Sequence, residues 1–137
     1  MLSNAVIGLK PDIRNDQLLD LATSVVNPSG RLHLVSLVQV GQDADERDRT
    51  SHVQEQVEET AERLRSAGYD VAVTVQVEMA SGVGAALLRL AEEVDADLIV
   101  IGLSKRSRVG KALLGSDAQS VLLGAACPVL TARFGPA

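Results

Sequence analysis

A short, unbroken apolar run is the feature that most limits how this chain can fold. Residues 98–101 read Leu-Ile-Val-Ile, and Gly102 closes the run. Four residues are too few for an ordinary helix, and most of them are β-branched. This pattern is typical of a strand that is buried on both faces inside a parallel sheet. We therefore expect a central parallel strand here.

The connection that follows this strand is strongly basic, although the whole chain has a net charge of −5. Beyond Gly102, a helical pattern opens at Gly115-Ser116. The interval holds no acidic residue and these basic ones: Lys105, Arg106, Arg108 and Lys111. Ligands of open α/β sheets bind beyond the carboxyl ends of the strands, and helix N-termini favour anions. The pattern predicts a site for a phosphate-bearing ligand.

Short apolar runs and helical stripes alternate along all 137 residues. Strands are expected at residues 4–9, 32–40, 71–78, 98–101 and 128–133. Helices are expected after Asp12, from about 50 to 67, from 81–84 onward and from Ser116. Such alternation defines a single α/β domain over residues 1–137, with an open, mainly parallel sheet of five strands and helices on both faces.

Local signals set the expected ends of these helices. Residues 27–30, Asn-Pro-Ser-Gly, are expected to close the first helix, and Gly68 is expected to end the second helix. Ser51 and Gln54 have the spacing of a capping box, which places the start of that helix after a loop at 41–49. Ser116 is of the N-cap type. The last helix is expected to bury one stripe: Ala118, Val121, Leu122 and Ala125.

Composition excludes several classes of function. Tyr69 and Phe134 are the aromatic residues of this acidic chain, so it lacks the platforms on which single-stranded nucleic acid stacks. No apolar stretch approaches the roughly 20 residues of a membrane span, and the N-terminus lacks the pattern of a signal peptide. The single cysteine, Cys127, forms no internal disulfide. These features predict a cytoplasmic protein with neither a nucleic-acid nor a membrane partner.

The glycine pattern around the basic connection resembles that of the universal stress proteins. That family carries the signature G-x2-G-x9-G-[ST] between its fourth strand and fourth helix, where it surrounds nucleotide phosphates and ribose. Here Gly102 is followed by Lys105 at the second glycine position and, nine residues later, by Gly115-Ser116. The flanking segments ADLIVIG, LLGSDAQSVL and ACPVLTAR are also similar to the family. The resemblance covers the whole chain in element order and is sharpest over residues 95–133.

The resemblance implies a Rossmann-like fold of the adenine-nucleotide alpha-hydrolase type, with strand order 3-2-1-4-5. It implies ATP or a related nucleotide as ligand, with Mg²⁺ only when the nucleotide is bound. It also implies a homodimer formed through the fifth strand, Pro128–Arg133. The residues implied to line the nucleotide site are Lys10, Val38, Ile101, Gly102, Lys105, Gly115, Ser116 and Asp117.

Two lysines depart from the family pattern. At Lys105, left-handed backbone in a side-chain-bearing residue costs about 1–2 kcal/mol, whereas a charge-assisted hydrogen bond contributes roughly 1.5–3 kcal/mol. Lys10 stands where ATP-binding members have an aspartate that contacts the nucleoside, and a lysine donates hydrogen bonds but accepts none. Lys10 instead adds a fifth cation to the expected crevice between the first and fourth strands. Asp12 lies two residues on and is a candidate substitute for the missing carboxylate.

Three functions remain open from the sequence. The first is a regulatory or protective stress protein that binds a nucleotide. The second is a dimeric stress protein that acts through protein–protein contacts, and the two lysines favour it. The third is a slow ATP hydrolase, although no nucleophile, base and orienting residue are arranged for catalysis. The histidines His33 and His52 lack metal-ligand spacing, Cys127 is expected to be a small buried residue, and Gly82-Val83-Gly84 is expected to be a helix-start turn.

Overall fold

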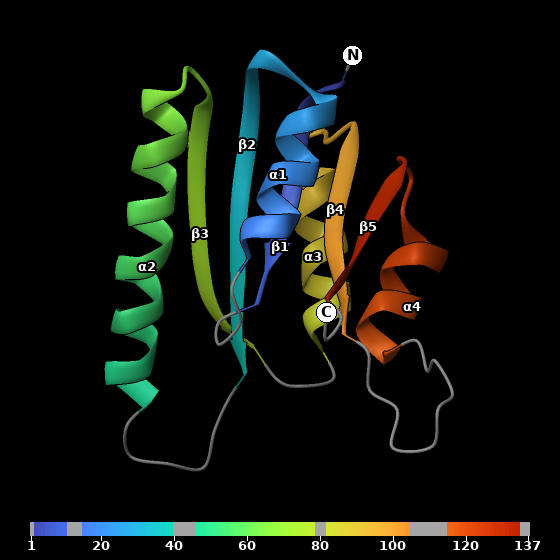
Figure 1. Cartoon of the computed structure of the whole chain (residues 1–137). Helices are drawn as coiled ribbons and strands as arrows, with labels where there is room; N and C mark the ends of the chain where they lie inside the picture. The colour runs from blue at the N-terminus through green and yellow to red at the C-terminus, as the bar shows by residue number, and fades with distance from the viewer. Residues whose placement is uncertain (1, 11–14, 40–45, 79–81, 105–114, 135–137) are drawn as a thin grey trace.

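The sheet has the strand order β3-β2-β1-β4-β5, as expected, and every pair of neighbouring strands is parallel. A computed structural model describes residues 2–10, 15–39, 46–78, 82–104 and 115–134 (Figure 1). The strands are β1 (Leu2–Leu9), β2 (Val26–Gln39), β3 (Asp70–Glu78), β4 (Leu98–Ser104) and β5 (Val129–Phe134). The helices are α1 (Asp16–Val25), α2 (Glu46–Ser66), α3 (Val83–Glu93) and α4 (Ser116–Gly124).

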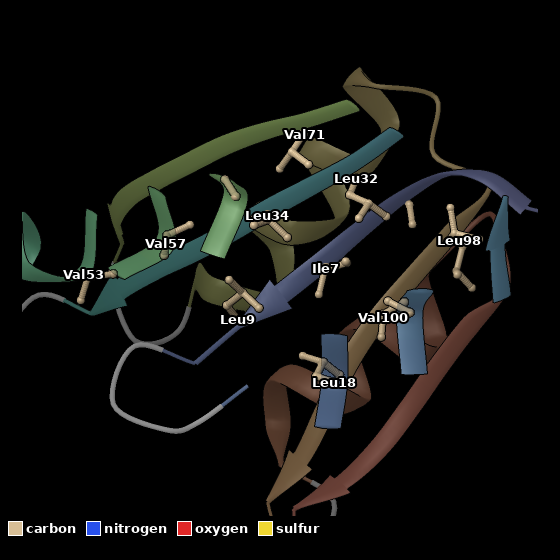
Figure 2. Close-up of a cluster of buried hydrophobic side chains, with 14 of the residues drawn as sticks. Ile7, Leu9, Leu18, Leu32, Leu34, Val53, Val57, Val71, Leu98 and Val100 are labelled. Atoms are coloured by element: carbon tan, nitrogen blue, oxygen red, sulfur yellow. The ribbon is translucent and has the colours of Figure 1, made fainter. Parts of the chain in front are cut away.

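The two faces of the sheet carry separate apolar cores. On one face, alternate strand residues such as Ile7, Leu34 and Val100 pack against α1 and α2 (Figure 2). On the other face, residues such as Val35 and Ile99 pack against α3 and α4. Successive strand side chains point to opposite faces, so strands buried on both faces read as continuous apolar runs. The expected three-layer arrangement is confirmed.

Two expected boundaries are wrong. The second strand, expected over residues 32–40, begins at Val26 directly after α1, and the chain bulges between the pairs Leu2–Val26 and Asn4–Arg31. The bulge is tight, since a Cβ added to Gly30 would lie 2.7 Å from a methyl carbon of Val26. Helix α2 begins at Glu46, so Ser51 and Gln54 lie inside it and form no capping box.

Other expectations about the helices are confirmed. Gly68, with φ +104°, ends α2 in the left-handed conformation that glycine tolerates. Helix α2 buries one face in the core, through Val53, Val57 and Ala61. None of the helices in the described part of the chain is long and apolar enough to cross a membrane.

Candidate nucleotide site

The candidate site lies where the winding of the sheet reverses. Strands β1 and β4 are neighbours, and Gly8 of β1 pairs with Ile101 of β4 near their carboxyl ends. From β1 the chain continues outward to β2 and β3, whereas from β4 it continues to β5 on the other side (Figure 1). Such a switch point opens a crevice beyond the strand ends, which is the usual ligand site of an open α/β sheet.

Lys10 directly follows β1 at the carboxyl ends of the strands. Its backbone N–H and carbonyl groups both form hydrogen bonds with Asn15. The Lys10 N–H donates to Oδ1 of Asn15 at 3.0 Å, and Nδ2 of Asn15 donates to the Lys10 carbonyl at 3.1 Å. These two bonds tie the end of β1 to the residue that precedes α1. The half-exposed Lys10 ammonium is therefore the part of this residue that is offered to a ligand. Asn15 was not singled out from the sequence, because side-chain-to-backbone pairs leave no periodic signal.

Val38 and Ile101 were both assigned to the site, yet their side chains belong to opposite faces of the sheet. Val38 is fully buried against α1 and α2, and Ile101 is buried against α3. Gly102 beside Ile101 is buried as well. A ligand at this edge would therefore meet the backbone of these residues rather than their side chains.

The first turn of α4 is open to anions. The N-cap residue is Gly115 rather than Ser116, and no side chain caps the helix. The expectation that Ser116 would be the N-cap is thus wrong: it is the first helical residue, and it is exposed. A Cβ on Gly115 would meet no atom of the described residues within 4 Å. Uncapped N–H groups at a helix start favour the binding of anions.

Asp117 performs a structural task at this helix start. Its Oδ1 accepts a hydrogen bond of 3.3 Å from the N–H of Gly84, the second residue of α3. The first turns of α3 and α4 are in tight contact, since a Cβ on Gly84 would lie 2.9 Å from Cβ of Ser120. The carboxylate thus positions the open turn of α4 against its neighbour.

The basic connection itself lies outside the described residues. This applies to Lys105 and to the other cations of that segment: Arg106, Arg108 and Lys111. Asp12, the candidate substitute for the missing carboxylate, also lies outside them. Among the residues that are described, no group of three or more His, Cys, Asp or Glu side chains is arranged to hold a metal ion.

At the opposite end of the sheet, where β1 and β4 begin, polar side chains form a hydrogen-bond network. The Asp97 carboxylate accepts hydrogen bonds from the N–H groups of Ser3 and Asn4 and from the Ser3 hydroxyl. The Asn4 amide donates to the carbonyls of Val94 and Asp95, and its Oδ1 accepts from Nε2 of His33 at 2.9 Å. His33 is therefore structural, as expected.

Three groups near the amino ends of the strands have shifted pKa values. Burial opposes ionisation of Asp97, but its hydrogen bonds outweigh that effect and hold the pKa of Asp97 below its usual range. Burial, followed by the nearby Arg31 charge, lowers the pKa of His33 despite the opposing effect of Asp70. Burial, followed by Asp97, raises the pKa of Cys127, so this thiol is poorly ionised and is not set up for redox chemistry.

The sheet order and the helix layers on both faces define a class of protein, the open parallel α/β proteins whose winding reverses between β1 and β4. A family model described as the universal stress protein family matches residues 14–133. The chain belongs to the universal stress protein family.

Relatives in sequence and structure agree with this membership. Universal stress protein MJ0531 of Methanocaldococcus jannaschii is 33% identical over 59% of this chain and 48% of its own length. A universal stress protein of Mycolicibacterium smegmatis is 42% identical over 47% of this chain and 51% of its own length. The matched regions thus span about half of each relative.

Two solved structures share the fold with ligands in place. The universal stress protein from Archaeoglobus fulgidus in complex with dAMP has a TM-score of 0.64 at 22% identity, covering 96% of this chain and 98% of that one. A universal stress protein in complex with cAMP has a TM-score of 0.68 at 21% identity, covering 97% and 98%. At these identities the likeness shows the fold alone.

Proposed function

We propose that this protein is a cytoplasmic regulatory or protective stress protein that binds ATP or a related nucleotide in the crevice between β1 and β4. One observation carries the proposal: α4 follows β4 in the chain and begins with an uncapped first turn, and no atom of the described residues lies within 4 Å of a Cβ built on Gly115. Two proteins of the same fold hold the adenine nucleotides dAMP and cAMP, which supports the choice of ligand.

The phosphates are assigned to the open turn. The backbone N–H groups at Ser116 and Asp117, together with the Ser116 hydroxyl, bind phosphate oxygens, and the Lys10 ammonium approaches from the end of β1. The backbone at Val38, Ile101 and Gly102 forms a wall of the crevice. Gly102 has no side chain that would clash with the ligand. From the sequence, Lys105 contributes a further ammonium group. Mg²⁺ enters only with the nucleotide, because the Asp117 carboxylate already accepts the Gly84 N–H.

The part of the site that would bind the nucleoside offers fewer suitable hydrogen-bond acceptors than the nucleoside needs, whereas the phosphate part is rich in donors. Lys10 occupies the position where a carboxylate would accept hydrogen bonds from a ribose or base, and its own carbonyl is bonded to Asn15. Binding should therefore depend on phosphate charge. We expect affinity to fall in the order ATP, ADP, AMP, with adenosine weakest.

Thermal and chemical unfolding with each nucleotide, with and without magnesium, tests the proposal. A ligand at one hundred times its Kd raises the free energy of unfolding by about 2.7 kcal/mol. Lys10→Gln should weaken ATP binding about tenfold, which corresponds to roughly 1.4 kcal/mol. Lys105→Gly should also weaken it. The matched control is Arg31→Gln at the amino edge of the sheet, where Arg31 forms an exposed ion pair with Asp70.

A second function is favoured by a specific observation. Lys10 stands in place of a carboxylate that would accept hydrogen bonds from the nucleoside. Its presence is also consistent with a family member that no longer binds nucleotides and acts as a dimer through protein contacts. We propose dimerisation through the edge strand β5 in either case. Stability that is unchanged by millimolar ATP would discard the nucleotide proposal in favour of this one. Release of ADP above the background rate would instead support slow hydrolysis.

A further inference from the structure

A separate cavity opens between α1 and α2, on the face of the sheet that α4 does not cover. Its volume is about 450 Å³, and its lining comes from the ends of β1 and β2 and from facing sides of the two helices. Small-molecule sites have volumes of roughly 300–1,000 Å³. The cavity therefore has the size of a ligand site.

The floor of this cavity contains a buried hydroxyl group with no partner. Ser36 lines the cavity from β2 and is completely buried, and within the described residues its Oγ makes no hydrogen bond. Ser36 occupies the core-facing position between Leu34 and Val38. An apolar residue at this position would leave no polar group without a hydrogen bond. A buried polar group without a partner is unfavourable, and such groups are often explained by a function. The hydroxyl is satisfied if a ligand pairs with it.

The rest of the floor is apolar. Leu9 at the end of β1 and Val53 and Val57 of α2 line the cavity, and Figure 2 shows all three on the same side of the sheet. Because a serine hydroxyl both donates and accepts hydrogen bonds, it pairs with a carbonyl, hydroxyl or amide group. The floor thus suits a ring or other apolar body with one polar group at its buried end.

The charges around the cavity oppose a phosphate. Lys10 and Arg63 are balanced by Asp16 and Glu59 on the same lining. Arg63 also directs a donor to the Thr60 hydroxyl at 3.3 Å, within the cavity wall. Because the described lining residues include two cations and two anions, they create no net field that would attract an anion. This distinguishes the cavity from the crevice at α4.

We propose that the α1–α2 cavity is a second binding site, which takes an uncharged, ring-sized organic molecule whose single polar group pairs with Ser36. The site shares Lys10 with the nucleotide crevice. It otherwise uses the opposite helix layer, so it does not depend on the nucleotide proposal. Polar side chains at the rim, including Gln56, bond the outer end of the ligand.

Titration of the ¹⁵N-labelled full chain with benzamide, followed by NMR, tests this site. Benzamide is neutral and carries one amide group on a ring. Amide signals of Ser36, Val53 and Val57 should shift, and benzoate should bind at least tenfold more weakly because of its charge. Shifts confined to other surfaces, or equal binding of benzoate, would overturn the proposal.

Ser36→Ala examines the hydroxyl directly. If Oγ has no partner in the free protein, the variant should unfold at the same temperature as the parent or a higher one, and it should bind benzamide about tenfold more weakly. A clear fall in the unfolding temperature would mean that the hydroxyl is already paired within the protein, and unchanged benzamide binding would mean that it is not used. Either result overturns the proposal.

Two glutamines of α2 provide a matched pair for the rim. Gln56 lines the cavity, whereas Gln54 bonds to Glu58 on the exposed side of the same helix. Gln56→Ala should weaken benzamide binding a few-fold, and Gln54→Ala should leave it unchanged. Saturating ATP should not displace benzamide. Displacement would show that the cavity is part of the nucleotide crevice and would overturn the claim of a second site.

Discussion

At the scale of single residues, the Asp97 side chain links segments that are distant in the sequence. It accepts hydrogen bonds at 3.0 Å from the N–H groups of both Ser3 and Asn4, more than ninety residues away. These bonds hold the start of β1 beside the start of β4, the central pair of the sheet. The carboxylate therefore acts as a clamp at the edge opposite the candidate site.

Loss of this clamp should lower stability. Asp97→Asn keeps the shape but loses the charge and one acceptor, and should reduce the free energy of unfolding by about 1–2 kcal/mol, allowing for partial exposure. Urea unfolding at pH 7 measures the change. Because the pKa of Asp97 is lowered in the folded state, its contribution is present above its unfolded pKa and disappears as pH falls through the folded value. The variant and the parent should therefore converge in strong acid.

The neighbouring Asp95 provides the control for this substitution. It adopts a positive φ of 53°, which asparagine tolerates, and its side chain forms none of these bonds. Asp95→Asn should stay within about 0.5 kcal/mol of the parent. A loss at Asp95 equal to that at Asp97 would contradict the clamp.

His33 should make the fold sensitive to mild acid. Burial and Arg31 lower its pKa, and the Asp70 carboxylate that faces it only partly offsets them. The unfolded chain thus binds the proton more tightly, so stability is full above the ordinary histidine pKa and falls as pH drops through the folded value. His33→Gln keeps a donor for Asn4 and should flatten the stability profile between pH 7.5 and 5.

At the scale of elements, the contact between α3 and α4 decides where the open turn of α4 lies. Gly84 allows the two helix starts to approach, and the Asp117 carboxylate bonds to its N–H. The sequence pattern had assigned Leu122 to the buried stripe of α4, yet Leu122 is 40% exposed. The helix packs through Val121, together with Ala118 and Ala125, instead. The alignment of α4 thus follows from close backbone contact rather than from its full apolar stripe.

Gly84→Ala should disturb this contact. The new methyl group would meet Cβ of Ser120 at 2.9 Å and the Asp117 carbonyl at 3.1 Å, neither of which moves easily. We expect a loss of about 1–3 kcal/mol in chemical unfolding, together with weaker ATP binding. Gly124→Ala is the matched control, because its methyl group would meet the movable end of Leu88. Equal losses in the two variants would argue against a special role for the α3–α4 contact.

At the scale of the whole molecule, the sheet has two open edges with different surroundings. Strand β3 lies at one edge, and β5 lies at the other beside α4 (Figure 1). Large apolar side chains are exposed on both sides of the molecule's core elements: Val77 of β3 is 43% exposed, and Leu123 of α4 is 88% exposed. An unpaired strand with exposed leucine nearby is the surface expected for association with a second copy.

Leu123→Lys should weaken the proposed dimer without unfolding the monomer. A buried leucine contributes roughly 1.5–3 kcal/mol, so replacement by a charge should raise the dimer Kd at least about tenfold. Sedimentation velocity over a range of concentrations measures this. Val77→Lys, at the β3 edge, should leave the dimer intact. If the two variants dissociate alike, or if neither does, the β5 edge is not the interface.

The family, the strand order that it implies and most of the buried strand residues were within reach of the sequence, because apolar periodicity and glycine spacing are local properties. Local spacing could not show that residues 27–30 remain in β2 as a bulge, or that α2 starts at Glu46. Nor could it show the bonds from Asn15 to Lys10 or from Gly84 to Asp117. Ser36 was not singled out from the sequence, and the lack of a partner for its Oγ among the described residues follows from the packing around β2. The sequence determined which faces are buried; tertiary packing decided which polar groups meet, since those pairs join segments that no local pattern connects.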